Sequence, residues 1–257
     1  MTSRGKLPVV TGGLGQLGRQ FAKALSNAGA KVAIVDVRTG EEDGAIMMQA
    51  DITKKNDVRN AFEKIEAALG TPNILINNAG IDAPPNAPPE TTGPFETFPE
   101  EVWDAVMDSH LKGAFLISQE FIKRLRVSGK QGSIINISST YGVVTSDQSL
   151  YDFKRKNGEV FFKPVVYSVA KSGMLNFTRW LAEYGAPLNI RANTLVPGGV
   201  FNNQPEEFVR EYSRRTPMGR MASEDEYNGA LLFLASHKAS SYMTGSTLIV
   251  DGGWTAR

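Results

Sequence analysis

The chain alternates short, continuously apolar runs with longer stretches in which apolar residues recur at helical spacing. Apolar runs of strand length occupy residues 7–11, 31–35, 46–50, 73–77, 133–137, 190–195 and 247–250. The helical pattern occupies residues 15–28, 55–69, 100–126, 164–184 and 223–235. Strands that read as unbroken apolar runs are covered on both faces, so the pattern predicts a doubly wound α/β fold around a parallel sheet. No linker or internal repeat divides the chain, and we expect one domain over residues 1–257.

Two stretches interrupt this alternation. Residues 81–99 are rich in proline and cannot form an ordinary helix or central strand. Residues 140–163 are polar and contain Asp147, Asp152 and the basic run Lys154-Arg155-Lys156. Both follow predicted strands, at the carboxyl edge of the sheet where ligands bind in such folds. We therefore expect substrate loops at 81–99 and 140–163, joined by residues 201–216 as a lid.

Composition narrows the choice of function without naming one. The chain has a formal net charge of +1 and no cysteine. A net charge near zero gives no electrostatic reason to expect nucleic acid or an anionic membrane as a partner. Without cysteine, disulfides, thiolate catalysis and cysteine-based zinc sites are excluded, and we assign no metal ligands. The N-terminus is short and polar, and no segment approaches the roughly 20 apolar residues that span a bilayer, so we expect a cytoplasmic protein.

A glycine-rich turn lies between the first predicted strand and the first predicted helix. It reads Thr11-Gly-Gly-Leu-Gly-Gln-Leu-Gly18. Glycines in such a turn let the backbone approach a pyrophosphate, and the helix N-terminus offers free N–H groups and a positive dipole end. We expect cofactor contacts from Gly12, Gly15, Gln16 and Leu17.

Acidic and small residues at the ends of the next strands extend this site. Asp36 ends the second strand, where a carboxylate can accept hydrogen bonds from the adenosine ribose and repel a 2′-phosphate. It favours NAD over NADP, although the nearby Arg38 could bind a phosphate. Asp51, followed by Ile52, could accept from the adenine amino group. The segment Asn78-Ala79-Gly80 would let the chain pass close to a flat ligand. Each of these features alone is also typical of a turn.

Tyr167-Ser-Val-Ala-Lys171 places a phenol and an ammonium on one face of a predicted helix. A nearby positive charge favours the tyrosinate, which would let Tyr167 exchange a proton with a substrate oxygen. The same spacing also occurs on ordinary solvated helix faces, so the pair needs support from the rest of the chain.

Together the motifs resemble the short-chain dehydrogenase/reductase family, and they occur in that family's order along nearly the whole chain. Besides those above, they are Ser138-Ser139, Asn193-x-x-x-Pro197-Gly198 and Val250-Asp-Gly-Gly253. The resemblance implies a Rossmann-type fold whose seven-stranded parallel sheet carries helices on both faces. It also implies a nicotinamide cofactor and a homo-oligomer, either a tetramer or a dimer.

The resemblance also implies a role for each residue of the motifs. Tyr167 would be the general acid/base, and Lys171 would lower its pKa and hold the nicotinamide ribose. Ser139 would orient the substrate oxygen, with Ser138 as its rival. Pro197 and Val200 would line the nicotinamide.

The chain departs from the family pattern at three places. Gln16 stands where a glycine is usual, so an amide would lie near the pyrophosphate. His110 stands where an asparagine is usual, and it would either join a proton relay, since histidine titrates near neutral pH, or only fill the space. Ser139 and Tyr167 are farther apart than usual, with Tyr151 at the customary distance. We prefer Tyr167, because the residue one helical turn after Tyr151 is Arg155, which cannot replace a lysine in a relay.

The sequence therefore predicts an NAD-dependent oxidoreductase that interconverts a secondary alcohol and a ketone by hydride transfer. The polar substrate segments favour a sugar, sugar acid or polyol, whereas Phe153, Phe161, Phe162 and Phe201 argue against one. Two alternatives stay open: a sugar epimerase or dehydratase that retains NAD, and a non-catalytic nucleotide-sensing protein.

Overall fold

The computed structural model describes residues 5–82 and 91–256, and it is built on one seven-stranded parallel sheet. The strand order is β3-β2-β1-β4-β5-β6-β7. The strands are β1 (Pro8–Thr11), β2 (Val32–Asp36), β3 (Ala45–Gln49), β4 (Ile74–Asn77), β5 (Gly132–Ile137), β6 (Ile190–Pro197) and β7 (Thr247–Val250). The chain winds outward from β1 to β3 and then crosses to β4, so the order reverses between β1 and β4. The predicted doubly wound α/β fold is confirmed, and the reversal is the point where ligands bind in such sheets.

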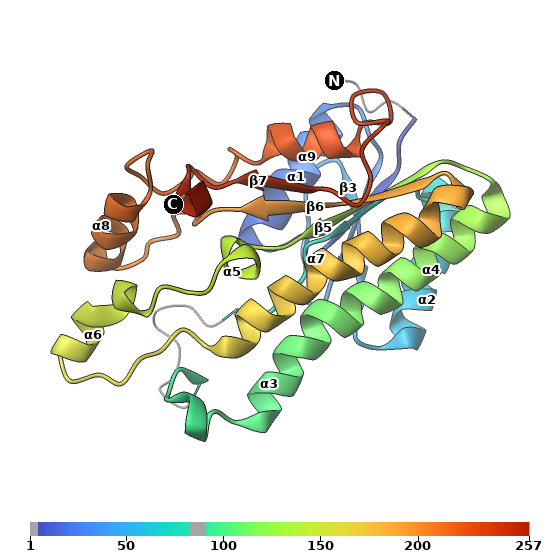
Figure 1. The fold of residues 1–257 in the computed structure, drawn as a ribbon. Helices are drawn as coiled ribbons and strands as arrows, with labels where there is room; N and C mark the ends of the chain where they lie inside the picture. Colours follow the sequence, from blue (N-terminus) through green and yellow to red (C-terminus); the bar gives the residue numbers. More distant parts are fainter. Residues whose placement is uncertain (1–4, 83–90, 257) are drawn as a thin grey trace.

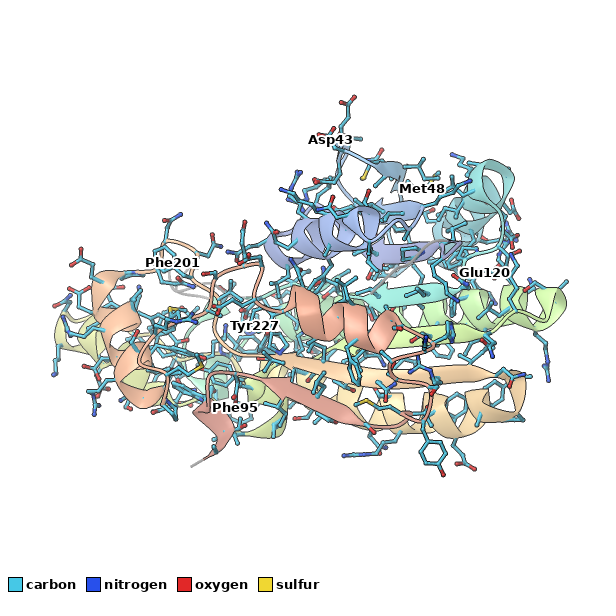
Figure 2. All side chains as sticks on the ribbon, turned by 90° about the horizontal axis from the view of Figure 1, so that it is seen from above. Asp43, Met48, Phe95, Glu120, Phe201 and Tyr227 are labelled. Carbon is cyan, nitrogen blue, oxygen red and sulfur yellow. The ribbon has the colours of Figure 1, made fainter. Side chains whose placement is uncertain are left out.

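Helices cover both faces of the sheet (Figure 1). One layer contains α1 (Gln16–Asn27) and α9 (Asn228–Ala235), and the other contains α2 (Lys55–Leu69), α4 (Gly113–Ser128) and α7 (Val165–Gly185). Each layer buries its own apolar cluster against the sheet. Tyr227, at the start of α9, is among the largest fully buried side chains (Figure 2). The continuous apolar runs read from the sequence are thus the strands between two cores.

The helix predicted over residues 100–126 is not continuous, which corrects the sequence analysis. It consists of α3 (Glu100–Met107), the π-helical turn η3 (Asp108–Lys112) and α4. Apolar spacing cannot reveal such a turn, because a π-bulge shifts the register by only one residue and leaves the chain helical on both sides. The helix expected over residues 223–235 begins only at Asn228, after a turn.

The segments at the carboxyl edge are partly helical. Residues 140–163 contain α5 (Thr140–Val143), η4 (Gln148–Tyr151) and α6 (Asp152–Lys156), and residues 201–216 contain α8 (Glu206–Arg215). Acidic residues in the first turn of α8 and Arg214 and Arg215 in its last turn complement the helix dipole. Helix α8 packs on the 140–163 segment through a small third core of Leu150, Tyr151, Phe161, Phe208, Tyr212 and Met221.

The remaining short helices are η2 (Phe95–Thr97), η5 (Ala186–Leu188) and η6 (Trp254–Ala256). Of the 81–99 segment, residues 83–90 lie outside the described residues. Within the described ranges, no helix combines the length and apolarity that crossing a membrane requires. The same residues contain no cluster of side chains placed to hold a metal ion.

Candidate active site

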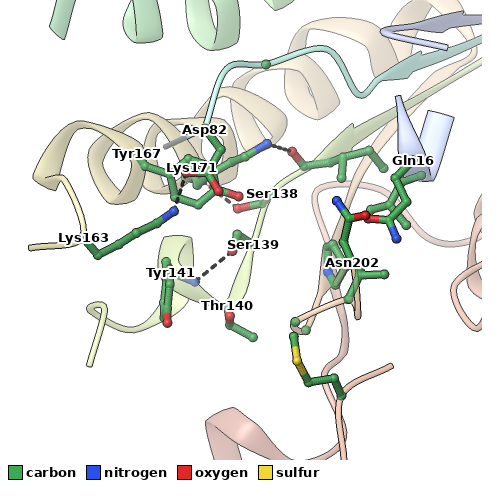
Figure 3. Close-up of a pocket in the computed structure, with 18 of the residues that line it drawn as sticks. Gln16, Asp82, Ser138, Ser139, Thr140, Tyr141, Lys163, Tyr167, Lys171 and Asn202 are labelled. Atoms are coloured by element: carbon green, nitrogen blue, oxygen red, sulfur yellow. Dashed lines mark hydrogen bonds and ion pairs between the residues drawn. The ribbon is translucent and has the colours of Figure 1, made fainter. Parts of the chain in front are cut away.

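A cavity of about 470 Å³ opens at the carboxyl edge of the sheet. Figure 3 shows Tyr167, Lys171, Ser139 and Lys163 on one side of it and Gln16 and Asn202 on the other. The described lining residues come from the glycine-rich turn, the ends of β4, β5 and β6, helix α7 and the segments at 140–163 and 201–216. This convergence is what the sequence analysis expected of a ligand site in such a fold.

Buried hydrogen bonds hold α7, and with it Tyr167 and Lys171, against the sheet. Asn136 on β5 donates to the Thr178 hydroxyl of α7 at 2.7 Å. The hydroxyls of Thr194 on β6 and Thr178 also lie 2.7 Å apart. Asn77 on β4 in turn donates to Asn136 at 2.7 Å. Because such a network is costly to leave half-satisfied, it fixes the position of α7 along the sheet.

Tyr167 and Lys171 lie on neighbouring turns of α7 beside Ser139. The Lys171 ammonium donates to the carbonyl of Ile137 at 2.9 Å and lies 5.7 Å from the centre of the Tyr167 ring. The Tyr167 hydroxyl hydrogen-bonds with Ser139. Ser138, which also lines the cavity, donates to the Lys171 carbonyl at 2.7 Å. The structure therefore brings together Ser139, Tyr167 and Lys171, and it gives Ser138 a structural partner.

The pKa expected for Tyr167 from its spacing to Lys171 is wrong for this chain. Burial raises the pKa of Tyr167 above its ordinary value, the Asp82 carboxylate adds to the rise, and Ser139 opposes it. Burial lowers the pKa of Lys171 to about 8, against the opposite influence of Asp82. Desolvation of the buried phenol is thus the largest influence on the pKa of Tyr167, and it favours the protonated form.

His110 lies in the π-helical turn and contacts Tyr167 edge to face, with 5.7 Å between ring centres. Its Nε2 is 2.8 Å from the carbonyl of Ile81, which can only accept, so Nε2 carries the proton. Burial and the charge of Lys171 lower the pKa of His110 to about 3, against the hydrogen bond to Ile81. The titration near neutral pH expected for a relay is therefore wrong. The residue instead holds the chain just before Asp82.

Tyr151, the alternative at the customary spacing, also lines the cavity. It packs against Phe161 and Phe208 at ring-centre distances of 4.6 and 5.5 Å, in the core between the 140–163 segment and α8. Burial raises its pKa, and Asp82 adds to the rise. Arg155, one helical turn after Tyr151, donates to the Gln148 and Phe161 carbonyls, so its guanidinium is bonded to the backbone of its own segment.

The glycine-rich turn brings backbone segments into close contact. Gly12 has φ +61°, and a Cβ there would lie 2.8 Å from the Ala79 Cα. Position 12 therefore requires glycine. A Cβ at Gly18 would lie 2.2 Å from the Gly12 carbonyl oxygen. Gly15 is the N-cap of α1 and provides no side chain to cap the free N–H groups of the first turn. These donors and the helix dipole form an anion-binding end.

Asp36 lies at the tip of β2 and contacts the same turn. It accepts from the Leu14 amide and the Arg38 amide, each at 3.0 Å. Burial opposes its ionisation, but hydrogen bonds from Arg38 and Leu14 outweigh burial and lower its pKa. The Asp36 side chain is 4% exposed and the paired Arg38 side chain 59% exposed, so only the guanidinium is free to move away. Both the carboxylate that favours NAD and the cation that tolerates a phosphate are present.

The remaining predicted cofactor contacts divide into two groups. Asn78, Gly80, Pro197 and Val200 line the cavity with Gln16 and Leu17. Asp51, Ile52 and Ala79 are not in its lining: Asp51 accepts from the Thr53 amide and hydroxyl ahead of α2, and Ile52 is buried.

Gln16 also connects two of the segments that line the cavity. Its amide donates to the Phe201 carbonyl at 2.8 Å and so joins the turn to the 201–216 segment. Asn202, which takes the place of a threonine usual in the family, also lines the cavity.

Two lining residues, Asp82 and Lys163, were missed as site residues. They form an ion pair on the same side of the cavity as Tyr167 and Lys171 (Figure 3). The prediction of a polar substrate rested on the polar residues of two segments, Asp147, Asp152, Lys154, Arg155, Lys156, Gln204, Glu206, Glu207 and Arg210. Of these residues, only Gln204 lines the cavity. The four phenylalanines set against a polar substrate, Phe153, Phe161, Phe162 and Phe201, are not in the lining either.

Comparisons with known proteins agree with this architecture. A family model described as enoyl-(acyl carrier protein) reductase matches residues 15–255. The chain is 30% identical to an NAD-dependent glycerol dehydrogenase of Listeria innocua, over 98% of this chain and 94% of that one. A short-chain dehydrogenase from Leptospira borgpetersenii, solved with bound NAD+, has a TM-score of 0.87 and 35% identity, covering 98% and 93% of the two chains.

A gluconate 5-dehydrogenase from Burkholderia cenocepacia, solved with NADP and tartrate, has a TM-score of 0.85 and 28% identity, covering 100% and 97%. Fold, family model and relatives together define an oxidoreductase that acts on CH–OH groups. The chain belongs to the short-chain dehydrogenase/reductase family.

Proposed function

We propose that the protein is an NAD-dependent oxidoreductase that interconverts a secondary alcohol and a ketone, with Tyr167 as the general acid/base. The observation that carries the proposal is the meeting of Ser139, Tyr167 and Lys171 in a cavity that is also lined by Gln16 and Leu17 of the glycine-rich turn. Bound nicotinamide would supply the hydride acceptor or donor. Gly12, Gly15 and Asp36 would hold the dinucleotide, with Lys171 near its second ribose.

The proton chemistry belongs to the chain. Tyr167, protonated at neutral pH because it is buried, donates its proton to the ketone oxygen in reduction and must accept one in oxidation. Ser139, hydrogen-bonded to Tyr167, orients the same substrate oxygen. Lys171 lies beside the Tyr167 ring and stabilises negative charge on the phenol oxygen when the proton leaves. We assign His110 a positioning role, because its proton is held on the Ile81 carbonyl.

We also propose that the substrate is a sugar, sugar acid or polyol. The relatives include a glycerol dehydrogenase and a gluconate dehydrogenase, and the cavity combines Asp82, Lys163, Asn202 and Gln204 with hydroxyl groups. Segments 81–99, 140–163 and 201–216 would enclose it as substrate loops.

The test is formation of NADH from a panel of polyols, aldoses and sugar acids, with Tyr167→Phe beside the wild type. We expect the variant to lose about 10²–10⁴ in kcat, the usual contribution of general acid–base catalysis, and to retain NAD binding. Tyr151→Phe should leave measurable activity. Turnover without added NAD would indicate the cofactor-retaining epimerase or dehydratase, and an unchanged Tyr167→Phe would contradict the proposal.

The preference for NAD rests on Asp36 and has its own test. Asp36→Ala should weaken NAD binding, since one charge-assisted hydrogen bond is lost. The kcat/KM with NAD divided by the kcat/KM with NADP should fall by roughly tenfold. Arg38→Gln should have little effect with NAD and lower activity with NADP. A wild type that prefers NADP would contradict this part of the proposal.

A homo-oligomer, tetramer or dimer, completes the proposal. Helices α4 and α7 expose Phe115, Val169, Trp180 and Tyr184 to solvent, and such apolar side chains on neighbouring helices favour burial against another copy. Light scattering coupled to gel filtration measures the mass directly.

A further inference from the structure

Asp82 and Lys163 come from different predicted substrate segments, line the cavity and form an ion pair. Their burial is unequal: the Lys163 side chain is 6% exposed and the Asp82 side chain is 46% exposed. A molecule that enters the cavity therefore meets the carboxylate, with the ammonium behind it. Asp82 is the only carboxylate among the described residues that line the cavity.

Both partners are held by hydrogen bonds from other parts of the chain. Ile81, next to Asp82, donates its amide to the Ser109 hydroxyl at 3.2 Å and accepts from His110 at 2.8 Å. The Lys163 amide donates to the Gln148 side-chain oxygen at 2.9 Å, and the Gln148 amide group donates back to the Lys163 carbonyl at 3.0 Å. The pair is therefore fixed before a ligand binds, which lowers the entropy cost of using it for recognition.

The pair is also adjacent to the reacting group. The Lys163 ammonium lies 4.8 Å from the centre of the Tyr167 ring, closer than the ammonium of Lys171 at 5.7 Å. The carboxylate of Asp82 is close enough to influence both Tyr167 and Lys171 electrostatically. A substrate carbon whose oxygen contacts Tyr167 would thus place its neighbouring substituent near Asp82.

We propose that Asp82, held by Lys163, is a subsite that accepts a hydrogen bond from a hydroxyl on the carbon next to the reacting one. This inference rests on the proposed function. A carboxylate accepts from hydroxyl donors and bonds them more strongly than a neutral acceptor does. It repels a carboxylate at the same position. The subsite therefore selects neutral polyols and sugars over sugar acids, and it narrows the substrate classes left open above.

Three small alcohols of similar size separate these chemistries: isopropanol has no neighbouring hydroxyl, propylene glycol has one, and lactate has a carboxylate there. For the wild type with NAD we expect kcat/KM for propylene glycol to exceed that for isopropanol by about ten- to a hundredfold, the value of one hydrogen bond to a charged group. Lactate should be the poorest of the three.

Asp82→Asn should reduce the preference for propylene glycol at least fivefold and improve lactate relative to isopropanol. The double variant Asp82→Ala/Lys163→Met removes both charges of the pair and should abolish the preference. The matched control is Glu159→Gln, whose carboxylate lies in the same segment as Lys163, pairs with Lys154 and is outside the cavity lining. It should keep the wild-type ratios.

The outcomes separate this subsite from the proposed function. The subsite is overturned if kcat/KM for isopropanol equals that for propylene glycol, or if Asp82→Asn keeps the preference for propylene glycol. The oxidoreductase assignment stands in both cases. If lactate is preferred, Lys163 rather than Asp82 binds the substituent and the proposal is also overturned. If no alcohol in either panel is oxidised with NAD or NADP, the proposed function fails and the subsite fails with it.

Discussion

The cofactor side and the substrate side of the cavity are built in different ways. The cofactor side is made of backbone in close contact: the turn from Gly12 to Gly18, the tip of β2 at Asp36, and Ala79 against Gly12. The substrate side is made of side chains that meet across long sequence distances, such as Lys163 with Asp82 and Arg215 with Asp147. In Figure 1 the helices of this second side, α5, α6 and α8, lie beyond the regular layers at one end of the sheet.

This difference predicts how each side responds to change. Backbone contacts at 2.2 to 2.8 Å from an added Cβ leave no room, so a single methyl group should have a large effect on the cofactor side. Side-chain pairs are partly exposed, so the substrate side should lose function in small steps and shift its specificity. The predictions below test this contrast, from the largest expected effect to the smallest.

Gly18→Ala should cause the largest loss. The new Cβ would lie 2.2 Å from the Gly12 carbonyl oxygen and 2.7 Å from the Gly13 Cα, and neither backbone atom can move without opening the turn. We expect NAD affinity to fall at least tenfold and the free energy of unfolding to fall by about 1–3 kcal/mol. Titration of NAD binding and chemical denaturation measure the two effects.

Gly229→Ala is the control for this change. Gly229 lies in α9, and nothing is within 4 Å of an added Cβ. There the substitution should stabilise the protein by about 0.5–1 kcal/mol, because alanine loses less backbone entropy than glycine in a helix, and NAD binding should not change. Equal NAD affinity in the two variants would show that NAD binding does not depend on the close backbone contacts of the turn.

The same contrast explains how much could be read from the sequence. The sheet, its strands and the glycine-rich turn follow from local patterns, because each apolar run or glycine spacing is confined to a few neighbouring residues. Tyr167 and Lys171 were identified for the same reason, since one helical turn relates them. The pairing of Asp82 with Lys163 has no local signal: neither residue belongs to a motif, and only the folded chain brings them together.

Burial and register caused the other errors. The pKa expected for Tyr167 came from the nearby Lys171, and the pKa expected for His110 was the ordinary value of a histidine, whereas desolvation is the largest influence on both in the folded chain. The π-helical turn that presents His110 is invisible in a helical pattern. The charges of the 140–163 segment were placed in the cavity, but Asp152 and Arg155 pair with each other, and Lys154 with Glu159.

The pH dependence of turnover tests the electrostatics of the substrate side. Because the pKa of Tyr167 is raised, the phenol is protonated at neutral pH, so alcohol oxidation should accelerate as pH rises. Asp82→Asn removes a charge that raises this pKa, so the rate–pH curve should move to lower pH. The comparison belongs well below pH 8, because the pKa of Lys171 is about 8 with Asp82 present and Asp82→Asn removes a charge that raises it.

His110→Asn separates this electrostatic effect from a proton relay through the histidine. The pKa of His110 is lowered to about 3, so the group stays neutral throughout the range, and the rate–pH curve should keep its shape. Loss of the hydrogen bond to Ile81 should instead raise KM. A rate–pH curve of altered shape in His110→Asn would support the proton relay. A curve that does not move in Asp82→Asn would contradict the influence of Asp82 on the pKa of Tyr167.

Arg215→Met should have the smallest effect and tests how α8 is held. Arg215 contacts Asp147 at 2.9 Å and donates to the Ser149 hydroxyl at 2.8 Å, so it fastens the end of α8 to the 140–163 segment. Pairs this exposed contribute about 1 kcal/mol or less, so we expect KM for the alcohol to rise only about threefold, with kcat nearly constant. Arg214→Met is the matched control, because Arg214 pairs only with Glu211 on its own helix among the described residues. If both variants raise KM equally, charge on α8 rather than its attachment controls substrate binding.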